Sequence, residues 1–269
     1  MVEKAILFDA TRCTACRGCQ VACKQWNELA GETTTFTGTY ENPSDLSAET
    51  WLKMKFTEKA ENGTFSWLFS RQSCMHCTEA ACVDVCPSGA LFHNEYGSVS
   101  QDKEKCIGCG YCMEFCPFNV PRLDAERFSG AGKMNKCTLC TRPGFNRIAE
   151  GLEPACVKTC PTDALIFGDR EELVAEGRRR VTDLKTPHSP AYPKANLYGE
   201  SELGGLHVLY VLADSPEVYG LPVNPQLPIV NQIRDILYPL RWVVWGGMAG
   251  VLLFNLVVAR IRQNQAKEE

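Results

Sequence analysis

Cysteine is the residue with the clearest chemical potential in this sequence, because thiolate sulfur binds soft metal ions and metal clusters. Sixteen cysteines occur among 269 residues, and they sort into four groups of four with none left over. The groups are Cys13, Cys16, Cys19 and Cys23; Cys74, Cys77, Cys82 and Cys86; Cys106, Cys109, Cys112 and Cys116; and Cys137, Cys140, Cys156 and Cys160. The count therefore predicts four complete sets of ligands.

The spacing inside these groups favours [4Fe–4S] clusters. In CIGCGYCMEFCP (106–117), three cysteines follow one another at intervals of three residues, and the fourth follows after an interval of four. A loop with this spacing places its first three thiolates on three corners of one cube, while the fourth binds a neighbouring cluster. Motifs of this kind work in pairs, so four motifs predict two ferredoxin-like modules that hold four [4Fe–4S] clusters.

Proline after the fourth cysteine supports this interpretation in three of the four groups. Pro87, Pro117 and Pro161 fix φ and remove an N–H donor, which suits a chain that turns sharply out of a ligand loop. The first group differs, because Lys24 takes this place.

Two other uses of cysteine are disulfide scaffolds and zinc sites. Disulfide scaffolds belong to short secreted chains, and the start MVEKAILFDA lacks the basic and apolar regions of a secretory signal. Structural zinc bound by four thiolates is the better alternative, although zinc usually takes two ligands from each of two separated CxxC pairs. Three thiolates from one CxxCxxC loop fit a cube better.

Basic residues flank the cysteines at six positions. A cube with four thiolates adds a charge of about −2 in its oxidised form, and nearby cations would offset this charge and raise the reduction potential. Ordinary surface charges are the alternative. The six residues are Arg12, Arg17, Lys24, Lys105, Lys136 and Lys158.

The rest of the composition indicates no substrate chemistry. A hydrophobic content of 45% and a formal net charge of −4 are ordinary for a folded protein and give no sign of a nucleic-acid partner. We find no nucleophile–base pair, phosphate-binding loop or dinucleotide fingerprint, so we assign no catalytic site. Electron conduction is the expected function.

Three further segments are expected to position or attach the cysteine groups. Alternating residues and Asn62-Gly63 predict a β-hairpin over 51–70. The proline-rich stretch after residue 185, with strand-like GLHVLYVLAD (205–214), predicts an extended segment that wraps another surface. WVVWGGMAGVLLFNLVVA (242–259) has no formal charge over eighteen residues and spans about 27 Å as a helix, which predicts one transmembrane helix.

Seven stretches carry a resemblance to a known family. They are CTACRGCQVACKQWN (13–27), ENPSDLSAETW (41–51), CMHCTEAACVDVCPSGA (74–90), CIGCGYCMEFCPFNVPRL (106–123), KCTLC (136–140), EPACVKTCPTDAL (153–165) and YGLP (219–222). On these stretches the chain resembles the iron–sulfur β subunits of membrane-anchored respiratory formate dehydrogenases.

The resemblance implies a nested pairing of the cysteine groups. In this pairing Cys13, Cys16 and Cys19 share a cluster with Cys160; Cys137, Cys140 and Cys156 with Cys23; Cys74, Cys77 and Cys82 with Cys116; and Cys106, Cys109 and Cys112 with Cys86. Spacing alone also permits a serial pairing of the first group with the second and of the third with the fourth.

The expected fold class is α+β: two nested ferredoxin-like [4Fe–4S] modules with an inserted β-hairpin, plus a C-terminal single transmembrane helix. The expected boundaries are 1–35 and 130–180 for the outer module, 36–70 for the hairpin, 71–129 for the inner module, 181–236 for the wrapping segment, 237–260 for the transmembrane helix and 261–269 for the tail.

The resemblance also implies partners and a location. Electrons would pass from a molybdenum or tungsten catalytic α subunit, through four clusters, to a membrane cytochrome b γ subunit and the quinone pool in anaerobic respiration. The chain would contact lipid of the cytoplasmic membrane, with its cluster domain outside and its C-terminus inside. The same role in a hydrogenase or another molybdoenzyme complex is the alternative, and a structural zinc protein is a remote one.

Overall fold

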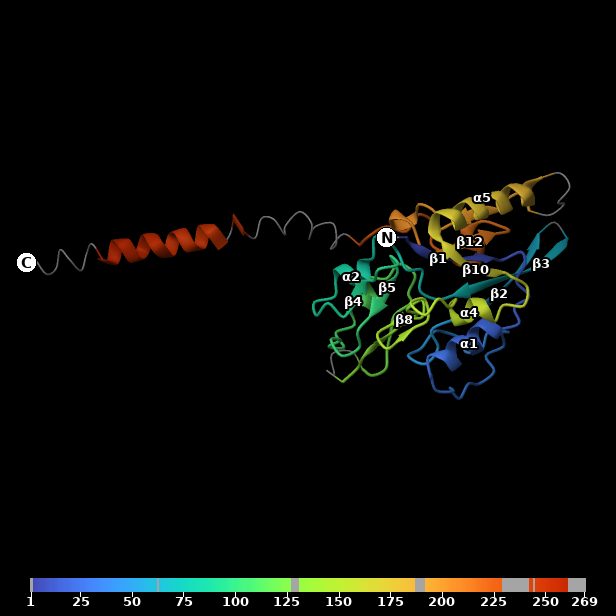
Figure 1. Ribbon diagram of the computed structural model, residues 1–269, viewed down its shortest axis with the longest axis horizontal. Coiled ribbons are helices and arrows are strands. Elements are labelled where there is room, and N and C mark those ends of the chain that lie inside the picture. Colours follow the sequence, from blue (N-terminus) through green and yellow to red (C-terminus); the bar gives the residue numbers. More distant parts are fainter. Residues whose placement is uncertain are drawn as a thin grey trace, which may run out of the picture. The chain divides into compact units, whose positions relative to one another are not determined.

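The computed structural model describes residues 2–61, 63–126, 131–186, 192–228, 242–243 and 245–260 (Figure 1). The chain divides into two compact units, Met1–Leu227 and Pro228–Glu269. All sixteen cysteines lie in the first unit, which mixes α-helices and β-strands.

A four-stranded mixed sheet forms the centre of the first unit. Its strands are β1 (Lys4–Asp9), β10 (Leu165–Asp169), β11 (Asn196–Tyr198) and β12 (Val208–Leu212), in the order β10-β1-β12-β11. β1 pairs antiparallel with β10 and parallel with β12. The apolar runs of β1 and β12 are buried, as expected for strands covered on both faces.

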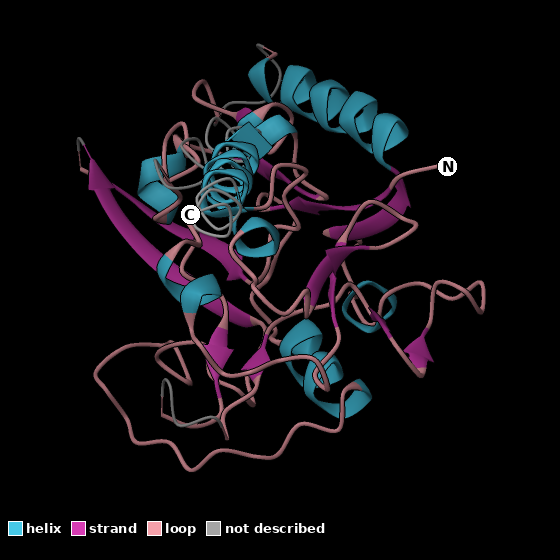
Figure 2. Cartoon of the chain, turned by 90° about the vertical axis from the view of Figure 1, so that its left-hand side faces the viewer, coloured by secondary structure: helices cyan, strands magenta, loops and turns pink. Residues whose placement is uncertain are grey.

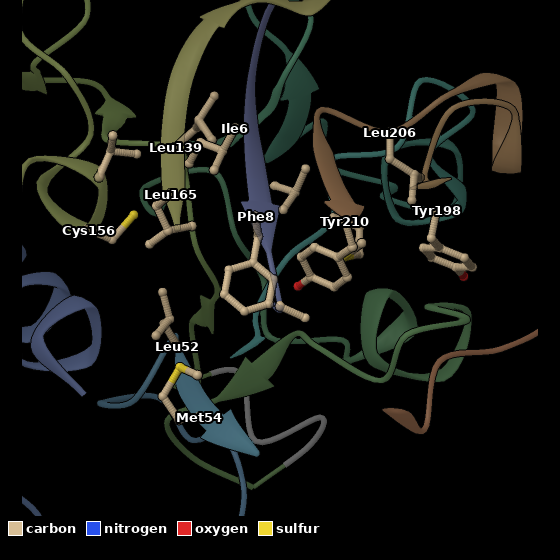
Figure 3. Packing of buried hydrophobic residues seen from close by; sticks show 14 of the residues in the cluster. Ile6, Phe8, Leu52, Met54, Leu139, Cys156, Leu165, Tyr198, Leu206 and Tyr210 are labelled. Carbon is tan, nitrogen blue, oxygen red and sulfur yellow. The ribbon is translucent and has the colours of Figure 1, made fainter. Parts of the chain in front are cut away.

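The two faces of this sheet pack against different parts of the chain. Alternate residues of a strand point to opposite faces. Ala5 and Leu7 pack with Leu173 of α5 (Arg170–Lys185), and this helix lies along the sheet (Figure 1). Ile6 and Phe8 point the other way, toward apolar residues of the cysteine-bearing segments (Figure 3). The sheet therefore separates a structural helix from the region that holds the thiols.

The hairpin predicted over 51–70 is present. β2 (Lys53–Glu61) and β3 (Thr64–Gln72) are antiparallel strands of nine residues each (Figure 2). Glu61 and Thr64 form the last residue pair of this hairpin. Their aromatic residues contact one another, with Phe56 and Trp67 ring centroids 5.8 Å apart. The opposite end of the hairpin, near Met54, reaches the apolar cluster beneath the sheet (Figure 3).

Short elements surround the cysteines. The helices are α1 (Gly18–Trp26), α2 (Ala81–Asp84), α3 (Tyr111–Glu114) and α4 (Ala155–Lys158), with 3₁₀ turns η1 (Glu202–Gly204) and η2 (Pro216–Tyr219). The paired strands are β4 (Leu91–His93) with β5 (Val99–Gln101), β6 (Arg122–Leu123) with β7 (Met134–Asn135), and β8 (Thr141–Arg142) with β9 (Phe145–Asn146). α1 packs against α4, and α2 packs against α3.

Part of the segment expected to wrap another surface contributes to the core instead. β12 is buried between β1 and β11, and Val208 and Tyr210 are 0% exposed. The prolines of this segment lie outside β11 and β12, so they do not interrupt the strand pairing. Residues 187–191 and 229–236 of the segment lie outside the described residues.

The prediction of a C-terminal transmembrane helix is wrong. Among the residues that the structure describes, no helix is both long and apolar enough to cross a membrane. The continuous helical run described here is 245–260, about 24 Å at 1.5 Å per residue, whereas the hydrocarbon core is about 30 Å thick. The prediction relied on the eighteen uncharged residues 242–259, whereas the continuous helix described here has sixteen residues. Residues 237–241, Val244 and the tail 261–269 lie outside the described residues.

Candidate functional site

All sixteen cysteines are described, and none of them forms a disulfide bond. Five of them are buried, Cys16 is exposed, and the others lie between these extremes. The buried cysteines are Cys23, Cys112, Cys137, Cys140 and Cys156. The thiols thus form a largely buried set of soft ligands.

A left-handed residue precedes the second cysteine of every group. Ala15, His76, Gly108 and Leu139 have φ between 49° and 71°. This conformation costs about 1–2 kcal/mol for a residue other than glycine. Its repetition at four equivalent places shows that the loops share one backbone turn. Successive amides in such turns make concave anion sites that occur at many iron–sulfur centres.

Backbone amides in these loops donate to cysteine sulfur. The N–H of Ala15 donates to Cys13 Sγ (3.4 Å), and the N–H of Leu139 donates to Cys137 Sγ (3.4 Å). Both bonds join a first cysteine to the amide two residues later. Hydrogen bonds to the sulfurs are among the means by which proteins tune cluster potentials.

A second turn follows the fourth cysteine in the three groups that carry proline. Gly89, Asn119 and Asp163, each three residues after that cysteine, have φ of 63°, 49° and 50°. After Cys23 the chain remains helical, and Lys24 Nζ donates to the carbonyls of Ala30 and Glu49 (2.8 and 2.6 Å). The departure from proline at Lys24 thus marks a real difference in local structure.

Electrostatic interactions between the thiols link the cysteines in four sets, which we name sites A to D. Site A contains Cys13, Cys16, Cys19 and Cys160; site B contains Cys23, Cys137, Cys140 and Cys156; site C contains Cys74, Cys77, Cys82 and Cys116; and site D contains Cys86, Cys106, Cys109 and Cys112. Each site combines three cysteines of one group with the fourth cysteine of another.

Burial and neighbouring thiols raise the pKa values of these cysteines. Burial raises the pKa of Cys23 well above its usual range, and the thiols of Cys137, Cys156 and Cys140 raise it further. Burial likewise raises the pKa of Cys112 to about 12, with added effects from its neighbours in site D. Iron binds the thiolate, so cluster binding here must release protons.

Adjacent sites also approach one another. Thiols of different sites interact at three places: Cys19 with Cys156, Cys137 with Cys74, and Cys82 with Cys112. The first of these contacts joins A to B, the second joins B to C, and the third joins C to D. These interactions link the four sites in the order A, B, C, D.

Two buried basic residues lie between the sites. Lys136 is 1% exposed, and its Nζ donates to the carbonyls of Val99 (2.6 Å) and Cys137 (2.9 Å). Arg71 is 2% exposed and interacts with thiols of A and B. Sequence reasoning named Lys136 as a flanking cation but missed Arg71. The signal that could have found Arg71 was the alternation of side chains along β3, which ends close to Cys74 in the sequence.

The donor chemistry fits iron–sulfur cubes. In the part of the chain that is described, no three His, Cys, Asp or Glu side chains converge on a position for a single metal ion. In a [4Fe–4S] cube each thiolate binds a different iron. Four thiols per site, amide donors to sulfur and buried cations match the needs of an anionic cube.

Comparison with known proteins identifies the class. Residues 12–90 and 65–170 match families described as the 4Fe-4S dicluster domain. Together with sixteen cysteines that form no disulfide, these matches define a ferredoxin-type electron-transfer protein that carries four [4Fe–4S] clusters. The predicted cofactors are thus confirmed.

The chain belongs to the family of formate dehydrogenase iron–sulfur subunits, as the sequence resemblance predicted. It is 44% identical to the formate dehydrogenase iron-sulfur subunit of Haemophilus influenzae over 254 residues, which cover 92% of this chain and 78% of the relative. It is 41% identical to the formate dehydrogenase-O iron-sulfur subunit of Escherichia coli K12 over 272 residues, which cover 99% and 86%. The hydrogenase-2 operon protein HybA of Escherichia coli O157:H7 is 35% identical over 265 residues, covering 87% and 77%.

Proposed function

We propose that this chain conducts electrons within a formate dehydrogenase complex, from a molybdenum or tungsten catalytic subunit to a cytochrome b subunit and the quinone pool. The observation that carries the proposal is the series of four linked thiol sites in a member of this family. A series of clusters moves electrons over a distance that no single cluster spans. The lower identity to HybA makes the same role in a hydrogenase complex the second candidate.

We propose that each of sites A to D holds one [4Fe–4S] cluster through its four cysteines. Two independent observations support this nested pairing over the serial one. The helices next to the first and fourth cysteine groups, α1 and α4, pack together, and so do α2 and α3 from the second and third groups. The thiol neighbours of Cys23 and Cys77 also come from the groups that nesting requires.

The chain's own residues contribute in three ways. The sheet and the hairpin bury the thiols, which excludes water from the sites. Amides such as that of Leu139 donate to sulfur and stabilise added negative charge. Positively charged Arg71 and Lys136 act in the same direction. The clusters, when bound, supply the one-electron redox chemistry.

We propose that the assembled complex operates at the cytoplasmic membrane, with the cluster domain on the outer side. Family resemblance supports this location.

Purification of the tagged chain from anaerobic cells tests the function. We expect a molybdenum- or tungsten-containing subunit to co-purify, and we expect formate to reduce the clusters as followed by electron paramagnetic resonance. Reduction by hydrogen but not by formate would assign the chain to a hydrogenase complex and contradict the proposal.

A further inference from the structure

The guanidinium group of Arg71 is buried and has no hydrogen-bonding partner among the described residues. Arg71 lies near the end of β3, opposite Met54 of β2, and is 2% exposed. Its Nε, Nη1 and Nη2 atoms are buried and find no partner in the described part of the chain. An uncompensated buried charge costs several kcal/mol, so a guanidinium kept in this state requires negative charge nearby.

Three thiols interact electrostatically with this guanidinium. The groups that interact with it most strongly are the thiols of Cys156, Cys137 and Cys19 and the phenol of Tyr210. The Tyr210 hydroxyl donates to the Arg71 carbonyl (2.8 Å), which holds the end of the strand in place. The Cys19 thiol lies 3.7 Å from the sulfur of Met54, so this end of the hairpin rests directly against site A.

Arg71 therefore interacts with thiols of two sites. Cys19 belongs to site A, whereas Cys137 and Cys156 belong to site B. A cube with four thiolates carries a charge of about −2, and it gains one more negative charge when it is reduced. Arginine stays protonated throughout, because its intrinsic pKa exceeds 12. In a site with little water, a fixed positive charge stabilises the reduced cube more than the oxidised one.

Lys136 provides a contrast. Its ammonium group is also buried, but two carbonyl oxygens accept its hydrogen bonds and compensate for its desolvation. Within the described part of the chain, the guanidinium of Arg71 has no such acceptors. Its charge is therefore available to the thiol sites on either side.

We propose that Arg71 is an electrostatic positioning residue that raises the reduction potentials of the clusters in sites A and B together, relative to a chain with a neutral residue there. This inference rests on the cysteine assignment made under the proposed function. It adds a specific role for a residue that is not a ligand.

A redox titration of three variants, followed by electron paramagnetic resonance, tests the proposal. Arg71→Met removes the charge and keeps much of the side-chain volume, and Arg71→Lys keeps the charge. Arg178→Met is the control, because Arg178 is an exposed arginine of α5. Dithionite and dye mediators set the potential, so the result does not depend on whether formate is the substrate.

We expect Arg71→Met to lower the reduced-to-oxidised ratio at least tenfold for two of the four clusters, which is about 59 mV for a one-electron couple. Arg71→Lys should keep most of the original potentials, and Arg178→Met should change none. Unchanged potentials in Arg71→Met, or an equal shift of all four clusters, would overturn the proposal.

If Arg71→Met loses clusters before it can be titrated, the iron content of the two Arg71 variants tests the role of the positive charge instead. Four clusters per chain in Arg71→Lys would support a requirement for positive charge. Loss of iron from both variants would show that packing is what matters at this position, and the proposal would fail.

Discussion

The carboxylate of Asp9 lies 3.1 Å from the guanidinium of Arg180. Asp9 is the last residue of β1, just before the first cysteine loop, and Arg180 belongs to α5, which follows the last cysteine group. Both side chains are largely buried, and Asp9 also accepts a hydrogen bond from the N–H of Thr11 (2.9 Å). This ion pair thus links the two ends of the segment that carries the clusters.

Arg180→Met should destabilise the chain by about 3 kcal/mol, because it leaves the buried carboxylate of Asp9 without its cation. Chemical denaturation of the anaerobic protein measures this loss. Arg179→Met is the matched control on the same helix, since the side chain of Arg179 is 61% exposed, and it should change stability by less than about 1 kcal/mol. Equal losses in the two variants would contradict this account of the link.

Acid should weaken the same helix through Glu176. Hydrogen bonds from Arg179 and Arg180 lower the pKa of Glu176 to about 2. Because the folded-state pKa lies below the unfolded value, the stabilisation is complete above about pH 4.5 and is lost as pH falls toward 2. The stability difference between the original chain and Glu176→Gln should therefore shrink as pH falls from 6 to 3.

Denaturation midpoints at several pH values measure this difference. Glu171→Gln, at the exposed start of α5, is the control. A difference for Glu176→Gln that stays constant across the range would show that the carboxylate makes no such contribution.

Gly108→Ala should disturb the third cysteine loop. Gly108 has a φ of 70°, and a Cβ at this position would lie 2.5 Å from the carbonyl oxygen of Gly132. The left-handed conformation alone costs about 1–2 kcal/mol for alanine, and the clash with the backbone adds to it. We expect a loss of stability above 2 kcal/mol together with a lower iron content, measured by denaturation and metal analysis.

Gly144→Ala separates the two contributions. Gly144 also has a positive φ, 78°, but open space surrounds its Cβ position. Gly144→Ala should therefore show the conformational cost alone and retain its iron. If both variants behave alike, the close approach of Gly132 has no effect on the loop.

The crossed assignment predicts where a ligand mutation acts. Cys116 lies in the third cysteine group, but its thiol belongs to site C with Cys74, Cys77 and Cys82. Cys116→Ser should alter the electron paramagnetic resonance signal of the cluster in site C and leave that of site D unchanged. Cys86→Ser should do the reverse, since Cys86 belongs to site D. A change confined to site D in Cys116→Ser would favour another pairing.

Local features of the structure were predictable from sequence where neighbouring residues determine them. Cysteine spacing predicted the clusters, and alternation with Asn62-Gly63 predicted the hairpin, because turn and strand preferences are short-range. Lys24 in place of proline marked the one group whose fourth cysteine is followed by a continuing helix. These predictions needed no knowledge of distant contacts.

Non-local contacts were not predictable in this way. β12 pairs in parallel with β1, about 200 residues earlier, and no local signal distinguishes such a strand from an extended segment. Burial of Arg71 depends on the same packing, since an arginine ending a hairpin is ordinarily exposed. The apolar run at 242–259 predicted a membrane span from composition, whereas no helix among the described residues is both long and apolar enough to cross a membrane.

The central claim is that four [4Fe–4S] clusters occupy this chain, and its most direct test is the content of iron and acid-labile sulfide. The complex is purified without oxygen, and the metals of its partners are subtracted. We predict about sixteen iron and about sixteen sulfide per chain. About eight of each, or about four zinc ions without sulfide, would contradict the account.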